Sequence, residues 1–330
     1  MEFEPTEEQA AARDLAARIF GDLATHERLA AAGTGTDAEL WKALCAAGLV
    51  EAVEETGLLG LVLLAEEQGR TTAQVPFTAS AVYGLLAVAR HGTEEQRARL
   101  LPGLRAGTTV VTGAFPAHEG AWVPWLRDAT HVLVPDEAKT LRLVPVTGTV
   151  EPVDLTAPWS AGRLPAFLLD GASGERLGGP EAYDDVLAAA RIAFAGLQAG
   201  VCAGSLARAV AYTSVREQFG RPLSSNQAVQ LRAADAHMDT ESIRVTAYEA
   251  AWRHDRALPV AGHALTAAWW ASEAGKRVVH AGQHLHGGLG ADLDHPVHRH
   301  FLWGRQLDAY LGSGTELLAE LGDLLAQGDI

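Results

Sequence analysis

Cysteine is scarce in this chain of 330 residues, which has only Cys45 and Cys202. The two lie far apart in the sequence, and neither belongs to a CxxC pair or to a Cys/His zinc spacing. A disulfide framework is therefore not the basis of the fold. We expect both cysteines to be small buried hydrophobic side chains of a protein kept in a reducing cytoplasm.

Positive charge and long apolar runs are also in short supply. The chain has 26 Lys and Arg against 41 Asp and Glu, a net charge of -15, which opposes binding to a phosphate backbone. No apolar run reaches the roughly 18 residues of a membrane span, and the first residues are acidic where a signal peptide would be basic. We expect a soluble, cytoplasmic protein without nucleic-acid or membrane partners.

Helical patterns fill residues 1–107. Thr6, Asp37 and Thr93 each precede an acidic first turn and are expected to cap helices. Apolar periodicity predicts further helices over 59–69 and 79–91. This part is predicted to be a helical domain.

Short β-type runs follow in residues 108–180, and helical periodicity returns over 181–330. The predicted strands are 108–112, 131–134, 141–144 and 166–169, separated by Gly, Pro and Asp. The predicted bundle helices are 186–215, 226–254 and 260–286, with shorter pieces after Pro296 and Thr315. The chain is thus mainly α, with a small, reduced β domain between two helical domains.

Three motifs in the C-terminal half carry a family resemblance. They are Arg216-Glu217-Gln218-Phe219-Gly220-Arg221-Pro222-Leu223, Gln283-His284-Leu285-His286-Gly287-Gly288-Leu289-Gly290 and Leu311-Gly312-Ser313-Gly314-Thr315. Together they resemble the flavin-cofactor signatures of the acyl-CoA dehydrogenases, FAD-dependent oxidoreductases of lipid metabolism. Local matches such as Glu66-Glu67-Gln68-Gly69-Arg70 extend the resemblance over nearly the whole chain. It implies an N-terminal helical domain, a β-barrel-like middle domain and a C-terminal four-helix bundle.

The first two motifs hold the residue types that bind the ADP part of FAD. A pyrophosphate needs a guanidinium and close backbone approach, and an adenine needs a flat apolar surface with amide partners. The resemblance assigns these roles to Arg216, Gln218, Phe219, Gln283, Gly287 and Gly288. In that family the FAD is held mainly by the neighbouring subunit, so the cofactor is shared across the interface. The alternative is that the arginine and the glycines only end helices.

The flavin half of the site is not matched. The family has a Thr-Glu-Pro then Ala-Gly-Ser-Asp stretch, and residues 113–120, which correspond to it here, do not contain that motif. The family also has a Trp-Ile-Thr-Asn-Gly-like strand, and residues 131–136 stand in its place without the motif. Those motifs hold the isoalloxazine ring and the substrate thioester in the family. We therefore expect no flavin pocket in this chain.

Both usual positions of the catalytic base are empty. The family's third motif usually contains Glu-Gly-Thr, and Ser313 stands in the place of that glutamate. Other members carry the glutamate just before an arginine that matches Arg191, and Ala190 stands there. A serine hydroxyl is too weak a base to remove an α-proton without a helper. No catalytic residue is expected.

Other motifs are weaker. His280 and His284 have an i,i+4 spacing that suits zinc, but without nearby Cys or paired carboxylates we favour surface and interface histidines and no metal. Gly312-Ser313-Gly314 lacks the nucleophile elbow of a serine hydrolase. Trp252, Trp269 and Trp270 are expected in core or interface packing.

The resemblance therefore suggests the small, non-catalytic subunit of an actinobacterial heterotetrameric (α2β2) acyl-CoA dehydrogenase. A homologous larger subunit would supply the base, the substrate would be a bulky acyl-CoA such as a steroid side-chain CoA thioester, and an electron-transfer flavoprotein would accept the electrons. Two alternatives stay open. One is a self-sufficient homo-oligomeric enzyme whose base is Glu241 or Glu249; the other is a non-enzymatic scaffold of the same fold.

Overall fold

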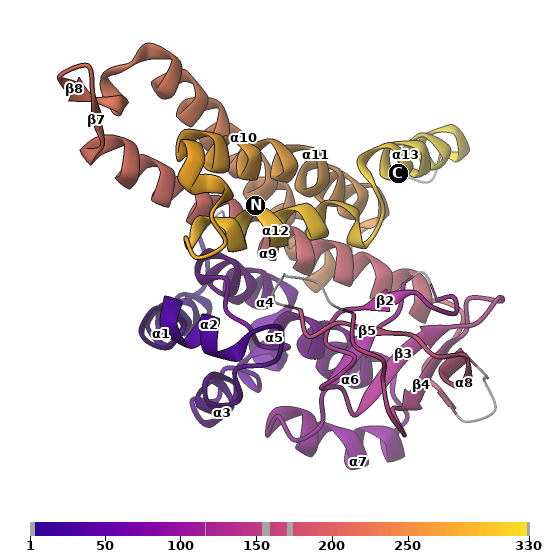
Figure 1. Cartoon of the computed structure of the whole chain (residues 1–330). Coiled ribbons are helices and arrows are strands. Elements are labelled where there is room, and N and C mark those ends of the chain that lie inside the picture. Colours follow the sequence, from indigo (N-terminus) through magenta and orange to yellow (C-terminus); the bar gives the residue numbers. More distant parts are fainter. Residues whose placement is uncertain (1–3, 116, 154–158, 170–173, 329–330) are drawn as a thin grey trace.

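The fold was analysed in a computed structural model that describes residues 4–115, 117–153, 159–169 and 174–328. Figure 1 shows the N-terminal helices below the long helices of the C-terminal part, with the strands beside them at lower right. Helical and β segments follow one another along the chain as the sequence predicts. The mainly α fold with a small β part is confirmed.

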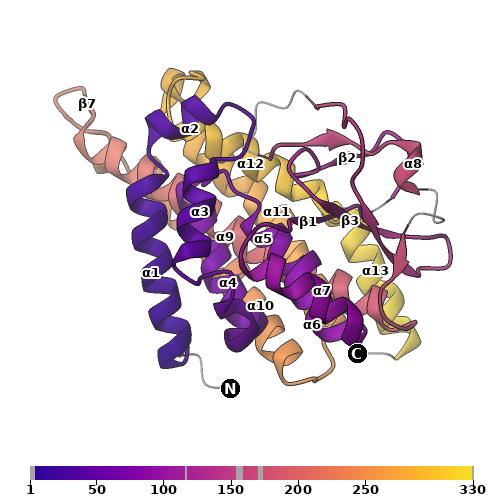
Figure 2. The same ribbon diagram turned by 90° about the horizontal axis from the view of Figure 1, so that it is seen from below.

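Predicted capping residues begin three of the N-terminal helices. The helices of this part are α1 (Glu7–Leu23), α2 (His26–Ala32), α3 (Ala38–Ala46), α4 (Ala52–Thr71), α5 (Phe77–Ala79), the π-helical η1 (Ser80–Leu86), α6 (Ala87–His91) and α7 (Glu94–Arg105). Thr6 and Thr93 form capping boxes with Gln9 and Gln96, and Asp37 accepts a hydrogen bond from the N–H of Leu40. Figure 2 shows α1, α3 and α4 side by side.

A kink divides α4 before the predicted start of its apolar run. Gly57 has a φ of 72°, a conformation that favours glycine, and interrupts the helix there. The N–H groups of Leu58 and Leu59, which the kink frees, donate to the carboxylate of Asp255 at 2.7 and 2.9 Å. A residue of the C-terminal part thus caps the second half of an N-terminal helix.

The β part contains a four-stranded sheet in the order β1-β3-β4-β6 and a two-stranded sheet of β2 and β5. The strands are β1 (Val111–Gly113), β2 (Trp122–Val123), β3 (His131–Pro135), β4 (Leu141–Pro145), β5 (Gly162–Arg163) and β6 (Glu175–Arg176). β1 and β3 run parallel, whereas β3, β4 and β6 are antiparallel. Side chains alternate between the faces, so Leu133 and Leu143 join the main core while Val132 and Val144 pack in a separate small core.

The strand predicted over 166–169 is wrong. These residues form a single helical turn, α8 (Ala166–Leu169), closed by a hydrogen bond from the N–H of Leu168 to the carbonyl of Pro165 at 3.0 Å. Leu168 is buried in the small core, and the free edge of β4 is paired with β6 instead. Four apolar residues in a row fit one helical turn as well as a strand, so composition could not distinguish the two.

The C-terminal part is built from α9 (Ala182–Val215), α10 (Gln227–Asp255), α11 (Ala261–Leu285), α12 (Val297–Tyr310) and α13 (Gly314–Gln327). A hairpin of β7 (Glu217–Gln218) and β8 (Arg221–Pro222), followed by the short η3 (Leu223–Ser225), joins α9 to α10. The hairpin projects from one end of the bundle in Figure 1. α9 is long and apolar enough to span a membrane, but 83% of its most apolar stretch is buried inside the fold.

Glycines let α4 and α9 cross backbone to backbone. A Cβ on Gly69 would meet the main chain of Leu197 and Val201, and a Cβ on Gly200 would meet the main chain of Glu66 and Arg70. The helical layer and the bundle are therefore held together where no side chain intervenes.

Candidate functional site

The first predicted cofactor motif forms the exposed hairpin after α9. Arg216 is the C-cap of that helix, and its carbonyl accepts a hydrogen bond from the N–H of Leu223 at 2.8 Å. Phe219 and Gly220 form the turn, with φ values of 54° and 75°. A positive φ is costly for a bulky residue such as phenylalanine, and residues held in this way concentrate at functional sites. The Phe219 side chain is 99% exposed.

The second motif ends α11. The side-chain amide of Gln283 donates to the carbonyl of Gly290 at 3.2 Å, which holds the short η4 turn (Gly287–Ala291) against the helix. Gly287 has a φ of 60° directly after the helix end, as a helix-terminating glycine does. The space above Gly287 and Gly288 is open, with no heavy atom within 4 Å of a Cβ built on either residue.

A ring contact joins the two motifs at one end of the bundle. Tyr212 stacks on His286 with ring centroids 4.9 Å apart. Arg216 lies one turn beyond Tyr212, since its N–H donates to the Tyr212 carbonyl at 2.9 Å, and Gly287 directly follows His286. Within the described parts of the chain Arg216 forms no ion pair. An uncommitted guanidinium, an exposed ring and open glycine backbone are features that fit an ADP group.

Ser313 caps a helix. It is the N-cap of α13, and both its N–H and its hydroxyl donate to the Glu316 carboxylate at 2.8 Å. The bond from the Ser313 backbone lowers the pKa of Glu316. A carboxylate with a lowered pKa is a poor proton acceptor, so this pair does not make the serine a base.

The second base position is closed as well. Ala190 is fully buried, and Arg191 beside it forms a bidentate ion pair with Glu320 of α13 at 2.8 and 2.6 Å. The hollow between Arg191, Tyr310 and Leu317 has a volume of about 20 Å³. That volume holds about one water molecule, whereas ligand pockets run from about 300 to 1,000 Å³. An acyl chain has no room here.

An aromatic cluster occupies the space where the β part meets α9 and α12. Its members come from six separate segments and are Tyr83, Phe115, Trp122, Trp159, Phe194, Trp303 and Tyr310. The rings of Phe194 and Tyr310 are 4.8 Å apart, and those of Trp159 and Tyr310 are 5.5 Å apart. Sequence analysis missed this cluster, because its members are distributed over more than 220 residues and no local spacing marks them.

The tyrosine hydroxyls of the aromatic cluster are satisfied internally. The Tyr83 and Tyr310 oxygens are 3.2 Å apart, and Tyr310 also donates to the carbonyl of Gly113 at 3.3 Å. Burial raises the pKa of both phenols. These groups remain neutral and serve packing.

The segment that replaces the family's flavin motif borders a small hollow. Residues 113–115 and 120–122 line about 200 Å³ together with Tyr310; Pro116 lies outside the described residues. This is below the usual size of a ligand pocket, and the aromatic cluster forms its wall. A hollow of this size has no room for a buried isoalloxazine ring with a substrate beside it.

The two alternative bases are engaged elsewhere. Glu241 pairs with Arg244, and Glu249 lies 3.0 Å from Arg253 and 3.5 Å from His263. Both belong to α10, which contributes none of the described members of the aromatic cluster. Both carboxylates are therefore held in ion pairs on α10.

The histidines near the second motif bind main-chain groups. His286 Nδ1 lies 2.7 Å from the Gly282 carbonyl, and the buried His300 lies 3.1 Å from the Arg70 carbonyl through Nε2. His280 packs edge-on against Phe301. Over the part of the chain that the structure describes, no group of three His, Cys, Asp or Glu side chains is arranged to hold a metal.

Two family models match this chain. Residues 6–108 match the acyl-CoA dehydrogenase N-terminal domain, and residues 178–321 match the acyl-CoA dehydrogenase C-terminal domain. Acyl-CoA dehydrogenase FadE27 of Mycobacterium tuberculosis is 30% identical, with 88% of this chain and 89% of that protein aligned. IpdE2 of Mycolicibacterium smegmatis is 28% identical over 96% of this chain and 98% of its own length.

Solved structures resemble the whole chain. The Tcur3481-Tcur3483 steroid ACAD G363A variant has a chain with a TM-score of 0.90 and 38% identity, covering 98% of both chains. A chain of the ChsE4-ChsE5 complex from Mycobacterium tuberculosis has a TM-score of 0.89 and 30% sequence identity, covering 99% of both chains. Butyryl-CoA dehydrogenase from Megasphaera elsdenii shares the fold. Its TM-score is 0.83 and its sequence identity 21%, with 99% of this chain and 100% of that one covered.

Proposed function

The chain belongs to the acyl-CoA dehydrogenase family, and from that premise we propose that it is the non-catalytic small subunit of a heteromeric, FAD-dependent acyl-CoA dehydrogenase. A homologous larger subunit supplies the catalytic glutamate and the flavin pocket in an α2β2 assembly. This chain holds the ADP half of the cofactor through the clasp, which consists of Arg216, Gln218, Phe219, Gln283, Gly287 and Gly288.

One contrast carries the proposal. At one end of the bundle, Arg216 and Phe219 are exposed, and the backbone of Gly287 and Gly288 is open. Where a base and a substrate would be needed, Ser313 caps a helix, Ala190 is buried, and the adjoining space is filled by the aromatic cluster. A chain with half of a cofactor site needs a second chain to complete it.

The relatives support the type of substrate and assembly. One similar structure is described as a steroid ACAD, and both it and the ChsE4-ChsE5 structure pair two different gene products. We infer a bulky acyl-CoA, such as a steroid side-chain thioester, as the substrate of the complex. In this complex FAD would supply the hydride acceptor, an electron-transfer flavoprotein would take up the electrons, and the complex would work in the cytoplasm.

The test is FAD binding by the co-purified complex. Replacement Arg216→Ala should remove a charge-assisted contact worth roughly 1.5–3 kcal/mol and weaken FAD binding by about 10- to 150-fold. The matched control is Arg18→Ala, which removes the same charge from an exposed position on α1. The wild-type complex should hold two FAD per tetramer. Four flavins per tetramer, or wild-type FAD affinity in the Arg216 variant, would contradict a shared site.

A further inference from the structure

Helices α9 and α11 pack against each other in layers that recur every seven residues. A Cβ on Gly275 would meet the side chain of Gln198. Seven residues later on both helices, a Cβ on Gly282 would meet the side chain of Ser205. The two helices therefore run in the same direction, and each layer brings a polar residue of α9 onto a glycine of α11. The residue seven positions after Ser205, which is Tyr212, belongs to the next layer.

Aromatic rings form that next layer, at the end of the bundle where the clasp lies. Tyr212 stacks on His286, with ring centroids 4.9 Å apart and an interplanar angle of 20°. The ring of His295, in the segment between η4 and α12, lies 5.0 Å from that of His286. His286 is 3% exposed. These three residues, which we call the ring stack, connect α9, the end of α11 and the start of α12.

Main-chain groups orient the two histidines of the ring stack. The Nδ1 of His286 lies 2.7 Å from the Gly282 carbonyl, which can only accept, so this nitrogen carries a proton and donates it. The Nδ1 of His295 accepts a hydrogen bond from the N–H of Val297 at 3.3 Å and therefore has no proton. Burial lowers the pKa of His295, and the adjacent His286 lowers it further, which favours the neutral ring.

The ring stack is attached to both halves of the clasp. Arg216 follows Tyr212 by one turn of α9, and Gly287 directly follows His286. Among the described residues, no hydrogen bond or ion pair joins the half on the β7–β8 hairpin to the half at η4. The ring stack is the packing layer nearest to both halves, so their separation depends on it.

We propose that Tyr212 and His295 are positioning residues for the ADP half of FAD. Acting through His286, they hold the hairpin half and the η4 half of the clasp at a fixed separation, so that one ADP group contacts both. A site that is ordered before its ligand arrives binds more tightly, because binding does not have to order it. The inference rests on the proposed function and adds to it, since neither residue belongs to the clasp.

The first test is the FAD affinity of the co-purified complex with a changed ring. Tyr212→Leu keeps an apolar side chain but removes the ring, and it should weaken FAD binding about 2- to 10-fold, which is the effect of one aromatic pair. Tyr212→Phe keeps the ring and should bind FAD as the wild type does. A role in stability alone would lower the thermal midpoint of the Leu variant and leave its FAD affinity unchanged. That result, or an equal loss of affinity in the Phe variant, would overturn the proposal.

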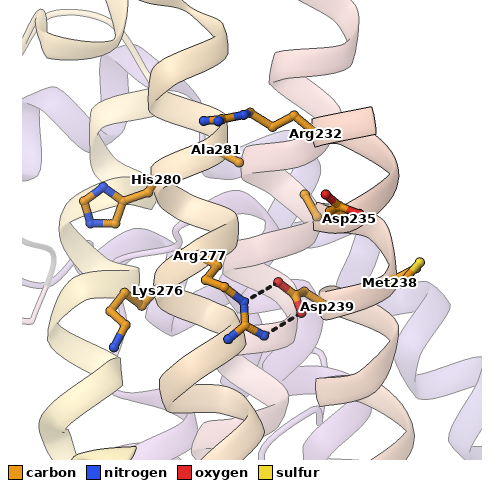
Figure 3. Close-up of a pocket in the computed structure, with 9 residues that line it drawn as sticks. Arg232, Asp235, Met238, Asp239, Lys276, Arg277, His280 and Ala281 are labelled. Atoms are coloured by element: carbon orange, nitrogen blue, oxygen red, sulfur yellow. Dashed lines mark hydrogen bonds and ion pairs between the residues drawn. The ribbon is translucent and has the colours of Figure 1, made fainter. Parts of the chain in front are cut away.

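The matched control is His280→Leu, which also removes a ring from a ring pair of the bundle. His280 packs on Phe301 with ring centroids 5.0 Å apart, and Figure 3 shows it on α11 among the residues that line a groove beside α10. This pair joins α11 to α12 and leaves the contact between α9 and α11 intact, so FAD affinity should stay at the wild-type value. A loss as large as that of Tyr212→Leu would mean that FAD binding responds to any ring removed from the bundle, and the positioning role would be wrong.

The second test combines two rings. His295→Leu should weaken FAD binding to a similar extent, and His295→Phe should retain most of the affinity. Because both residues act through His286, the double variant Tyr212→Leu/His295→Leu should lose less than the product of the two single losses. Losses that multiply would refute the common action. His295 is half-buried in a connecting segment, so its variants decide the question even where a change at Tyr212 prevents folding.

The variant Arg216→Ala separates this inference from the proposed function. Retained FAD affinity in Arg216→Ala contradicts the clasp itself, and the role of the ring stack with it. Lost affinity in Arg216→Ala beside wild-type affinity in Tyr212→Leu and His295→Leu overturns the positioning role alone.

Discussion

Asp185 ties the N-terminal helices to the bundle through a buried charge cluster. In the first turn of α9, its carboxylate accepts a hydrogen bond from His91 of α6 at 2.7 Å and lies 3.2 Å from both Arg90 and the Nε2 of His254 in α10. His91 and His254 are 8 and 7% exposed. His254 in turn adjoins Asp255, which caps α4 at its kink.

The charges of this cluster stabilise the fold only within a window of pH. Burial alone would raise the pKa of Asp185, but His254 and His91 outweigh it and the pKa lies well below the usual value. Burial alone would lower the pKa of His254, but Asp185 and Asp255 outweigh it and the pKa is raised. The contribution of Asp185 is lost as the pH falls below about 4, and that of His254 as the pH rises through its folded pKa above about 6.5.

We therefore expect Asp185→Asn to lower the free energy of unfolding by about 3 kcal/mol at pH 5.5. This is the lower end of the range for a buried pair that loses one partner, chosen because the Asp185 side chain keeps 20% of its exposure. At pH 8.5 the difference should be smaller, because His254 loses its charge as the pH rises through its raised pKa.

The measurement is urea unfolding of the wild type and the variant at both pH values. Asp184→Asn is the matched control, because it removes the same charge from the same helix turn at an exposed position. It should cost no more than about 1 kcal/mol, the usual value of an acid at a helix N-terminus. Equal losses for Asp184 and Asp185, or a loss for Asp185 that does not change with pH, would refute the reasoning.

Two further predictions concern catalysis and packing. The chain by itself should not dehydrogenate any acyl-CoA. Ser313→Glu should not create the activity, because the adjoining hollow of about 20 Å³ admits neither flavin nor substrate. Flavin bleaching by the wild-type chain or by this variant, without a partner, would contradict the prediction. Gly200→Ala should destabilise the fold by several kcal/mol, because the new methyl group meets the main chain of α4. The control Gly21→Ala has open space around it and should be neutral or stabilising by up to about 1 kcal/mol. Comparable thermal midpoints for the two glycine variants would contradict the packing argument.

Local signals predicted much of the fold. The caps at Thr6, Asp37 and Thr93 depend on a side chain bonding its own helix, so the sequence contains all the information needed. The long bundle helices were predicted from their apolar periodicity, to within a few residues. The segment 166–169 was not, because its conformation depends on which strand pairs with β4.

The candidate site likewise has parts that local sequence predicts and parts that depend on the tertiary fold. The clasp residues belong to two continuous motifs, and they remain predictions that FAD binding must test. The sequence shows Ser313 and Ala190 at the two usual glutamate positions, and the absence of a base that they indicate stays a prediction. The filling of the pocket was not readable, because Tyr83, Trp159 and Tyr310 meet only through the tertiary fold.

The aromatic cluster also bears on whether a mutation could introduce a catalytic site into this chain. A single substitution that restores a carboxylate gains nothing while the rings occupy the space. A single substitution that removes a ring, such as Trp159, costs about 3–5 kcal/mol and still provides no base. Every intermediate on the way back is thus less stable and no more active. Under the proposed function, this packed interior would keep the chain dependent on its larger subunit.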